Sequence, residues 1–292
     1  MSAVAIEGLT IIGESINDSV PSTRKLFDAD DVDGIVALAN AQDEAGAGYI
    51  DVNVGTRSAE FMAEMVRRVQ QVTSKPLAID TPDPEIARAG LEAYDPDRAG
   101  GARPILNSVS SLRTEMFDLY QVQPFRPILL VSEHVVDGRS QPCRTAEETF
   151  AATQFLVNAF CSDGRDVTVD DCIIDPGIAP IGSDATGNIH RLIAAMEMIH
   201  ADEHLSGVHA SVGLSNFTVM LPPKRADGSP VKTPLGSAFL TKAMPLGLDM
   251  VIGSVKRKYR LLDPDHPAML CLEDCLKMEG FDVIMRVREF YA

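Results

Sequence analysis

The alternation of short apolar runs with longer amphipathic segments limits the fold of this 292-residue chain more than any other feature. Runs rich in Ile, Val and Leu predict buried strands, and the segments between them repeat apolar residues every three or four positions, as helices do. The predicted strands are 9–13, 49–54, 76–79, 104–106, 127–131, 172–174, 211–214 and 250–252. The predicted helices are 30–45, 59–73, 83–94, 112–120, 145–162, 187–200, 234–246 and 267–279, with a terminal helix at 281–291.

Strands that are apolar on both faces and are separated by helices indicate a parallel sheet. Eight such units in one chain fit a closed (β/α)8 barrel, the TIM barrel of the α/β class, better than an open doubly wound sheet. No predicted strand runs into G-x-G-x-x-G, and the sequence contains no G-x-x-x-x-G-K-[ST] loop, which disfavours nucleotide-binding folds. We expect residues 1–292 to form a single domain.

Composition narrows the range of partners and compartments. The formal charge of −16 would repel nucleic acid and anionic membrane surfaces, so neither is expected as a partner. The sequence has no long apolar stretch and no signal-peptide pattern, which favours a cytoplasmic location.

Five cysteines, an odd number, fit free thiols in a reducing compartment. Cys271 and Cys275 are four residues apart, but a zinc site needs further ligands, so we predict no metal and treat both as small buried apolar residues.

Polar side chains follow six of the predicted strands. The residues are Glu14 and Asn17, then Asp51 and Asn53, then Asp80, Asn107, Asp175, and finally Ser215 and Asn216. Any one of them could cap a helix or shape a turn. In this kind of barrel, however, catalytic groups lie at the carboxyl ends of the strands, and six loops carrying polar residues together favour a site.

The chemical character of these residues indicates what they would bind. A carboxylate can accept two parallel hydrogen bonds from a ring N–H and a neighbouring amine, while an amide can donate to a carbonyl and accept from an amine. Such groups suit a neutral or cationic heterocycle with an edge like that of guanine or a pterin. Few basic residues stand among them, so we do not expect a phosphate site.

The same strand ends carry a recognisable series of motifs. In order, GESIN, YIDVNVG, LAID, ILNS, CIIDPGI and GLSN resemble the pterin-binding methyltransferase family, which includes methyltetrahydrofolate:corrinoid methyltransferases and the folate domain of cobalamin-dependent methionine synthase. The resemblance extends from residue 11 to residue 253 and implies a barrel like that of dihydropteroate synthase. The chain differs from dihydropteroate synthases themselves in its first loop. That loop usually reads N-x-T-x-D-S-F in those enzymes, whereas this chain has NDSVPS.

The resemblance implies roles for individual residues. Asp80, Asn107 and Asp175 match residues that hold the pterin ring, and Asp175 is the best match for the group that binds the ring N–H and the 2-amino group. Asn216 matches a mobile asparagine that approaches N5, the nitrogen that carries the methyl group. Asn216 and Asp80 are therefore the predicted catalytic residues.

Four further residues are predicted to bind the pterin. Gly213 and Ser215 would line the same wall as Asn216, and Asn17 and Asp51 are secondary candidates. Five of the six histidines, His190, His200, His204, His209 and His266, are expected on helices or loops as surface or capping groups.

The reaction that the resemblance implies is methyl transfer between N5 of tetrahydrofolate and the cobalt of a corrinoid. Methyltetrahydrofolate or tetrahydrofolate would be the substrate. We expect the cobalamin to be carried by a separate corrinoid protein. Departing N5 needs a proton or a strong hydrogen bond, and Asn216 would stabilise it while a proton arrives through water linked to Asp80 or Asn107. A homodimer is expected by resemblance, and the direction of transfer stays open.

Two alternatives remain at this point, and two segments depart from the family. The chain could be a condensing enzyme like dihydropteroate synthase, which would need a pyrophosphate site, or a non-catalytic folate-binding barrel. After the fifth strand, VSEHVVDG places Glu133 and His134 at the rim. The segment 224–234 is longer than expected, and its Lys224 or Arg225 matches a basic residue of the family.

Overall fold

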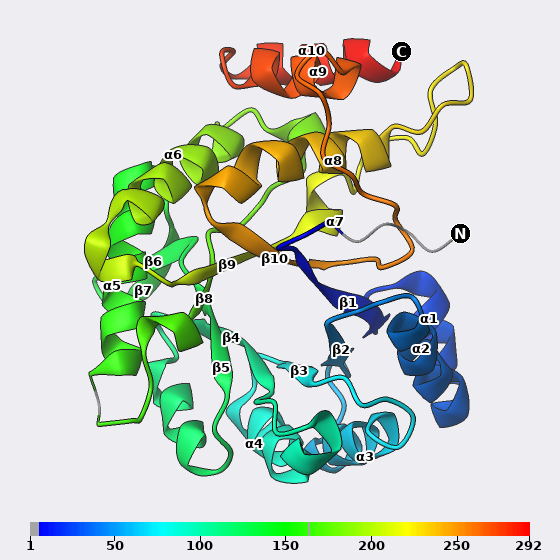
Figure 1. Cartoon of the computed structure of the whole chain (residues 1–292), viewed down its shortest axis with the longest axis vertical. Helices are drawn as coiled ribbons and strands as arrows, with labels where there is room; N and C mark the ends of the chain where they lie inside the picture. The colour runs from blue at the N-terminus through cyan, green and yellow to red at the C-terminus, as the bar shows by residue number, and fades with distance from the viewer. Residues whose placement is uncertain (1–5, 163) are drawn as a thin grey trace.

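Eight parallel strands form a closed barrel, as predicted. The structure is a computed structural model and describes residues 6–162 and 164–292. Around the barrel the order is β1-β10-β9-β8-β5-β4-β3-β2, so the last strand pairs with the first (Figure 1). The strands are β1 (Thr10–Asn17), β2 (Tyr49–Asn53), β3 (Leu77–Asp80), β4 (Ile105–Ser110), β5 (Arg126–Leu130), β8 (Ile173–Asp175), β9 (His209–Gly213) and β10 (Leu248–Gly253).

Helices surround the barrel and bury its outer face (Figure 1). They are α1 (Pro21–Asp28), α2 (Val32–Glu44), α3 (Ala59–Val69), α4 (Pro84–Ala93), α5 (Ala146–Cys161), α6 (Asn188–Ala201), α7 (Leu214–Phe217), α8 (Lys232–Ala243), α9 (Pro267–Cys275) and α10 (Phe281–Tyr291). The 3-10 helices are η1 (Pro96–Ala99), η2 (Thr114–Gln121), η3 (Val169–Asp171), η4 (Ile181–Ser183), η5 (Glu203–Leu205) and η6 (Met244–Leu246). Thr145 and Glu148 form a capping box at the start of α5, which satisfies backbone N–H groups there.

The interior of the barrel is closed by an apolar layer. Six buried side chains from six strands form it, namely Ile12, Ala78, Ile105, Ile128, Ile173 and Met250. Side chains on a strand alternate between faces, so the residue two positions later also points inward. In β1, β3, β4 and β8 that residue is Glu14, Asp80, Asn107 and Asp175, respectively. The apolar layer therefore supports polar groups at the carboxyl ends of the strands and separates them from water below.

Two local predictions were wrong, and two elements were missed. The helix α1 was not predicted, because its eight residues are too few for an apolar repeat to stand out. The segment predicted as helix 112–120 is the 3-10 helix η2, with buried Met116 and Leu119 three residues apart. Leu214 belongs to α7 and not to the strand before it. The chain after β5 forms an antiparallel hairpin, β6 (Glu133–Val136) and β7 (Arg139–Pro142), which includes Glu133 and His134.

The last helices do not cover the seam between β10 and β1. Residues 254–266 run without regular structure to α9, which packs on α8, and α10 packs on α9 in turn, so both lie outside α8 (Figure 1). A cavity of about 570 Å³ remains beside the start of β1. The end of α2 and the loop from Val255 to Tyr259 line the rest of it.

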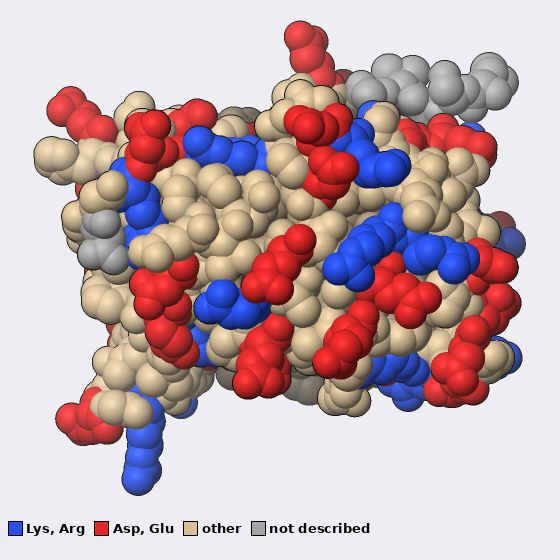
Figure 2. All heavy atoms as spheres, turned by 90° about the horizontal axis from the view of Figure 1, so that it is seen from below, with Lys and Arg blue, Asp and Glu red and all other residues tan. Residues whose placement is uncertain are grey.

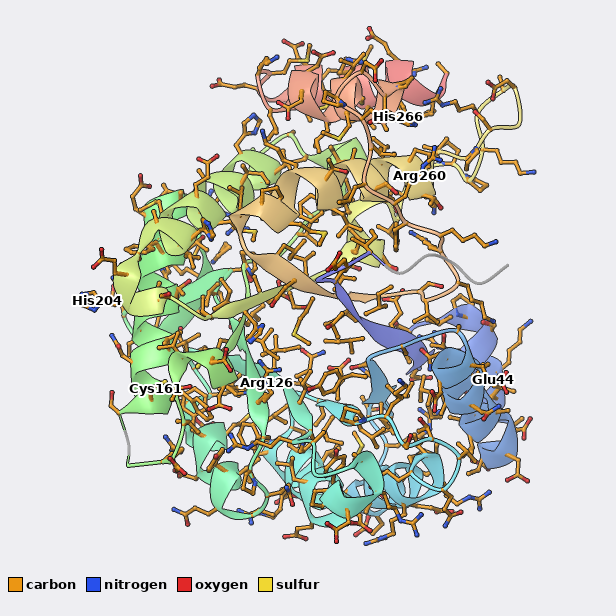
Figure 3. The ribbon with its side chains drawn as sticks, viewed as in Figure 1. Glu44, Arg126, Cys161, His204, Arg260 and His266 are labelled. Carbon is orange, nitrogen blue, oxygen red and sulfur yellow. The ribbon has the colours of Figure 1, made fainter. Side chains whose placement is uncertain are left out.

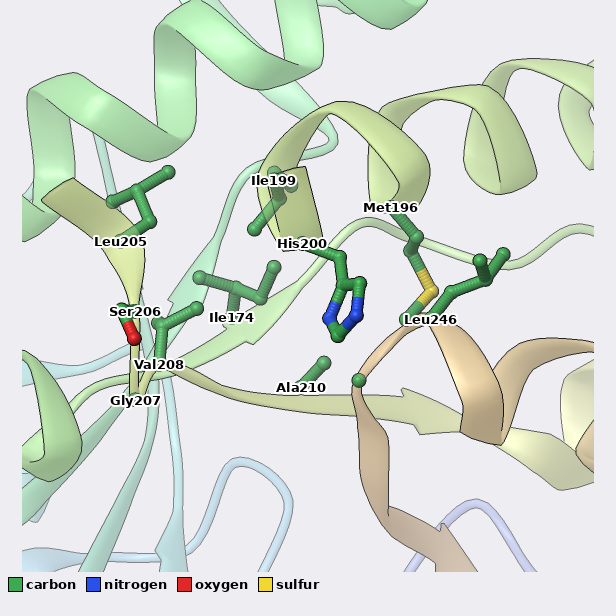
Figure 4. A pocket seen from close by; sticks show the side chains of 11 residues that line it. Ile174, Met196, Ile199, His200, Leu205, Ser206, Gly207, Val208, Ala210 and Leu246 are labelled. Atoms are coloured by element: carbon green, nitrogen blue, oxygen red, sulfur yellow. The ribbon is translucent and has the colours of Figure 1, made fainter. Parts of the chain in front are cut away.

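The amino ends of β9 and β10 carry an ion-pair cluster. His209 was expected on a helix or loop, but it begins β9, where its ring contacts Asp249 through Nδ1 and lies 3.5 Å from Asp170 through Nε2. A cavity of about 140 Å³ lies at the same end between α6 and the strands (Figure 4). His200 lines it beside Ala210. Both features lie at the end of the barrel that usually serves stability, opposite the carboxyl ends of the strands.

The outer surface is charged and mixed. Acidic and basic side chains alternate over the face shown in Figure 2 without forming one large field of either sign. His204 lies at the edge of the molecule, and His266 caps α9, since its Nδ1 accepts a hydrogen bond from the N–H of Ala268 (Figure 3). Within residues 6–162 and 164–292, we find no helix with the length and apolar character needed to span a bilayer.

Candidate functional site

Three carboxyl groups from neighbouring strands lie on one side of the barrel interior. Glu14, Asp51 and Asp80 come from β1, β2 and β3. Burial raises the pKa of Asp51, and the charges of Asp80 and Glu14 raise it further. Asn53, the last residue of β2, donates a hydrogen bond from Nδ2 to Oδ2 of Asp80 at 2.8 Å. Burial raises the pKa of Asp80 from 3.8 to about 6, although this hydrogen bond from Asn53 lowers it. Asp80 can therefore gain or lose a proton near neutral pH.

Asn107 extends this group to β4. In the parallel ladder it pairs with Asp80, and its carbonyl oxygen accepts a hydrogen bond from the N–H of Thr81 at 2.9 Å. Its side-chain amide lies close enough to Asp51 to lower the pKa of that carboxyl, so the amide is directed into the barrel. An amide here can both donate to and accept from a bound ring.

Asp175 lies two strands away, at the end of β8. Burial raises the pKa of its carboxyl from 3.8 to about 6, against the lowering effects of the Gly177 N–H and the Arg191 charge. The Gly177 N–H donates to Oδ1 of Asp175 at 2.7 Å. No other hydrogen bond to this side chain occurs in the part of the chain that the structure describes. Its second oxygen is available to a ligand.

Arg191 holds the loop that follows Asp175. Its guanidinium donates to the carbonyl oxygens of Pro176 at 2.7 Å and Gly177 at 3.0 Å, and to Oγ1 of Thr149 at 2.7 Å. Gly177 has a φ of +70°, and a β-carbon there would lie 2.4 Å from Cβ of Ser132. The loop therefore needs glycine at this position. Sequence reasoning missed Arg191, and its only signal was one arginine within the apolar helix that follows β8.

The turn after β9 places Asn216 against Gly213. A β-carbon on Gly213 would lie 2.8 Å from Nδ2 of Asn216, so the absence of a side chain makes room for this amide. Asn216 is exposed, and its side chain forms no hydrogen bond with any residue that the structure describes. The neighbouring Ser215 hydroxyl donates a short hydrogen bond to Glu14 Oε1, which connects the turn to β1. Asn216 thus has a free amide at the same end of the barrel as the carboxyl groups.

Two predicted positions have local partners instead. Asn17 Oδ1 accepts hydrogen bonds from the N–H and hydroxyl of Ser19, as in a turn that leads into a helix. Arg225 lies over the ring of Phe290 in α10, with 3.8 Å between guanidinium carbon and ring centroid. Arg225 therefore connects the rim loop to the terminal helix.

Basic residues do follow the last strands, contrary to the sequence argument against an anion site. Arg257, four residues after β10, donates to Oγ1 of Thr218 at 3.3 Å. Lys232, at the start of α8, donates to the carbonyl oxygen of Val219 at 3.1 Å. The charge of Arg257 contributes to lowering the pKa of Lys232, so the two cations are neighbours. They flank the loop after α7, where a bound anion would be stabilised.

The two close cysteines on α9 have apolar surroundings. Cys271 and Cys275 are buried, and their sulfur atoms lie 4.0 Å and 3.9 Å from the carbonyl oxygens of Arg286 and Val283 in α10. These contacts fit the interpretation of both as small buried residues.

Solved structures share this fold. A Xanthomonas albilineans dihydropteroate synthase with 4-aminobenzoic acid superposes with a TM-score of 0.54 at 19% identity, covering 92% of this chain and 89% of that one. A Yersinia pestis dihydropteroate synthase in complex with a sulfonamide drug gives 0.55 at 15% identity, covering 91% and 92%. At such identities the likeness shows the fold, which is the dihydropteroate-synthase-like barrel that the sequence predicted.

Sequence comparison adds relatives with known names. A methylcorrinoid:tetrahydrofolate methyltransferase of Eubacterium limosum is 28% identical over 250 residues, covering 84% of both chains. A methionine synthase of Mycobacterium leprae is 25% identical over 298 residues, covering 95% of this chain but only 23% of that protein. Residues 16–253 match the family described as pterin binding enzymes. The match includes every strand of the barrel except the first part of β1, and the chain therefore belongs to the pterin-binding enzyme family.

Proposed function

We propose that this protein is a cytoplasmic methyltransferase that moves a methyl group between N5 of tetrahydrofolate and the cobalt of a corrinoid. The main observation is that two half-buried acceptors, Asp80 and Asp175, lie at the same end of the barrel as an amide without a hydrogen bond, that of Asn216. Similarity to a methylcorrinoid:tetrahydrofolate methyltransferase supports the same reaction. The corrinoid would be carried by a separate protein that docks over this end, and the barrel would act as a homodimer.

The hydrogen-bond acceptors at the strand ends would bind the pterin. The Asp175 carboxylate would accept two hydrogen bonds, from the ring N–H and the 2-amino group, and Asn107 and Asp80 would bind other edges of the ring. Gly213 and Ser215 would line the wall beside Asn216. Asn17 and Asp51 are further candidates from the sequence, although Asn17 has a local turn and Asp51 is fully buried.

The proposed chemistry concerns charge on N5. When the methyl group leaves, the electron pair of the carbon–nitrogen bond stays on N5, which then needs a proton or a strong hydrogen bond. The Asn216 amide would donate such a bond without changing its own charge. Asp80, with a pKa of about 6, would supply the proton directly or through water. The same groups would serve either direction of transfer.

One assay tests this proposal against its alternatives. Purified protein is mixed with methyltetrahydrofolate and free cob(I)alamin, and the cobalt absorbance is followed; methylcobalamin should form. If methyltetrahydrofolate binds but no transfer occurs in either direction, even with a cognate corrinoid protein, a non-catalytic folate-binding barrel is the better conclusion.

Arg257 and Lys232 favour a second candidate, a condensing enzyme like dihydropteroate synthase, because they could stabilise pyrophosphate. Condensation of a pterin pyrophosphate with 4-aminobenzoic acid would then be observed instead.

Gly213 offers a specific mutational test of the Asn216 position. In Gly213→Ala, the new methyl group would lie 2.8 Å from Nδ2 of Asn216 and displace the amide, so methyl transfer should fall by about tenfold or more. Gly253→Ala is the matched control, because its β-carbon would meet nothing nearer than Leu214 Cβ at 4.0 Å. Rates are compared in the cobalamin assay. Equal rates for the two variants would contradict this role of Gly213.

A further inference from the structure

Asp51 lies deeper in the barrel than Asp80, Asn107 and Asp175. In the ladder between β2 and β3 it pairs with Ala78, which belongs to the apolar layer, whereas Asp80 is one inward-facing position higher. The exposed fraction of Asp51 is 0%. At the carboxyl end of β2 the inward-facing residue is Asn53, which contacts Asp80. Asp51 therefore lies beneath Asp80 and is covered by it.

The Asp51 carboxyl lacks the partners that a buried charge needs. Neither of its oxygens forms a hydrogen bond of normal geometry with any described residue. Its ionisable neighbours are Asp80 on β3 and Glu14 on β1, both acidic, and the one polar neighbour that favours its charged form is the Asn107 amide. A buried carboxylate without a cation is costly, and three carboxyl groups this close cannot all be charged. One proton must be kept among them.

The deepest group is the one that keeps the proton. Burial, followed by the charges of Asp80 and Glu14, raises the pKa of Asp51 well above its usual value of 3.8. Asp80 has a hydrogen bond from the Asn53 amide that stabilises its charge, and Glu14 accepts one from Ser215. The proton therefore resides on Asp51, below the groups nearest the carboxyl ends of the strands.

We propose that Asp51 is a positioning residue that stores a proton beneath the site and passes it to Asp80. This inference rests on the proposed methyl transfer. As the methyl group leaves and the bond pair stays on N5, N5 takes a proton from Asp80, and Asp80 takes the proton of the Asp51 carboxyl. Asp51 is left as a carboxylate, and a solvent proton that enters through Asp80 restores it after the folate product leaves. In the opposite direction each proton moves the other way.

The stored proton can be observed without substrate. A protonated carboxylic acid has a C=O stretching band separate from that of carboxylates, so infrared spectra of the free protein at about pH 8 should contain this band. Asp51→Asn should remove it. Asp80→Asn should keep the band, because Asp51 stays buried in that variant. Asp227→Asn should also keep it, because this substitution changes an exposed carboxyl. A wild-type protein without the band, or a band that survives in Asp51→Asn, would overturn the proposal.

The role in transfer is tested by the pH dependence of the rate. In single-turnover methyl transfer, Asp51→Asn should lose activity progressively as the pH rises, because Asp80 then lacks its internal donor. The alkaline limb of its profile should move to lower pH. If the wild type transfers methyl and Asp51→Asn has the same pH profile, Asp51 does not store the proton. The proposed methyl-transfer function would be unaffected by that result. If wild type neither binds folate nor transfers methyl, the proposed function itself fails.

Asparagine has nearly the same shape as aspartate and cannot ionise, so the variant should fold. Circular dichroism and thermal unfolding of Asp51→Asn check this, and Asp51→Thr is the second variant if Asn fails. Either variant should lose the infrared band and show the altered pH profile.

Discussion

Replacing Asp175 with asparagine is expected to weaken methyltetrahydrofolate binding by about 10²- to 10⁴-fold. The carboxylate would accept two charge-assisted hydrogen bonds from the pterin, and each such bond contributes about 1.5–3 kcal/mol. The asparagine NH₂ would instead face a donor of the ring, so one bond is lost and a repulsive contact is added. Isothermal titration calorimetry measures the change. Asp170→Asn, five residues earlier and at the opposite end of the barrel, is the control and should bind normally.

The same substitution should stabilise the free protein. In the folded state the pKa of Asp175 is about 6, above its usual 3.8, so its contribution to stability is fully present below about pH 4 and is lost as pH rises through 6. A difference of about two pH units corresponds to about 3 kcal/mol at most. Asp175→Asn should therefore raise the free energy of unfolding at about pH 8 and raise it less at about pH 5. Urea unfolding at both pH values provides the measurement.

Pterin affinity of the wild type should depend on pH for the same reason. The carboxylate form of Asp175 accepts both hydrogen bonds, so affinity should fall as the pH is lowered through about 6. An Asp175→Asn protein that binds methyltetrahydrofolate as tightly as wild type would remove Asp175 from the pterin site. Loss of binding together with loss of stability would indicate misfolding instead of loss of a ligand contact.

Asn216→Ala is expected to reduce the methyl-transfer rate by about 10²- to 10³-fold with little change in pterin affinity. Removal of one well-placed donor from a developing negative charge typically has an effect of this size. The amide has no other hydrogen bond to the described residues, so its removal should leave the fold intact. Single-turnover rates and binding constants, measured separately, test the expectation.

Val219→Ala is the control for this loop, because Val219 is 54% exposed and lies three residues beyond Asn216. It should transfer methyl at the wild-type rate. If Asn216→Ala instead lowers affinity and rate by the same factor, the amide contributes to ring binding in general and has no special role at N5.

Much of the barrel could be predicted because its strands are buried on both faces. Such strands are continuous runs of Ile, Val and Leu, and these runs identified all eight barrel strands to within a few residues. The hairpin of β6 and β7 was missed because each strand has only four residues, none of them buried and most of them polar, so no apolar repeat stands out. The helix α1 was missed because eight residues contain barely two turns.

The residues of the candidate site could be selected from the sequence, but their arrangement could not. Asp80, Asn107, Asp175 and Asn216 could be selected because each interrupts or follows an apolar run. The side chains that hold these residues in place come from parts of the chain that are distant in sequence. Arg191 reaches the loop after Asp175 from α6, and Ser215 reaches Glu14 across 201 positions of the chain. No local pattern contains such contacts.

The sequence by itself determined the barrel class and the types of group at the strand ends, because both follow from the alternation of apolar and polar residues along the chain. Only the tertiary structure decided which of those groups reach the mouth. Parallel register places Asp51 level with Ala78 and Asp80 level with Asn107, so two aspartates that look equivalent in sequence differ in depth. Depth controls solvation and therefore the pKa, and burial accordingly raises the pKa of Asp51 well above its usual value.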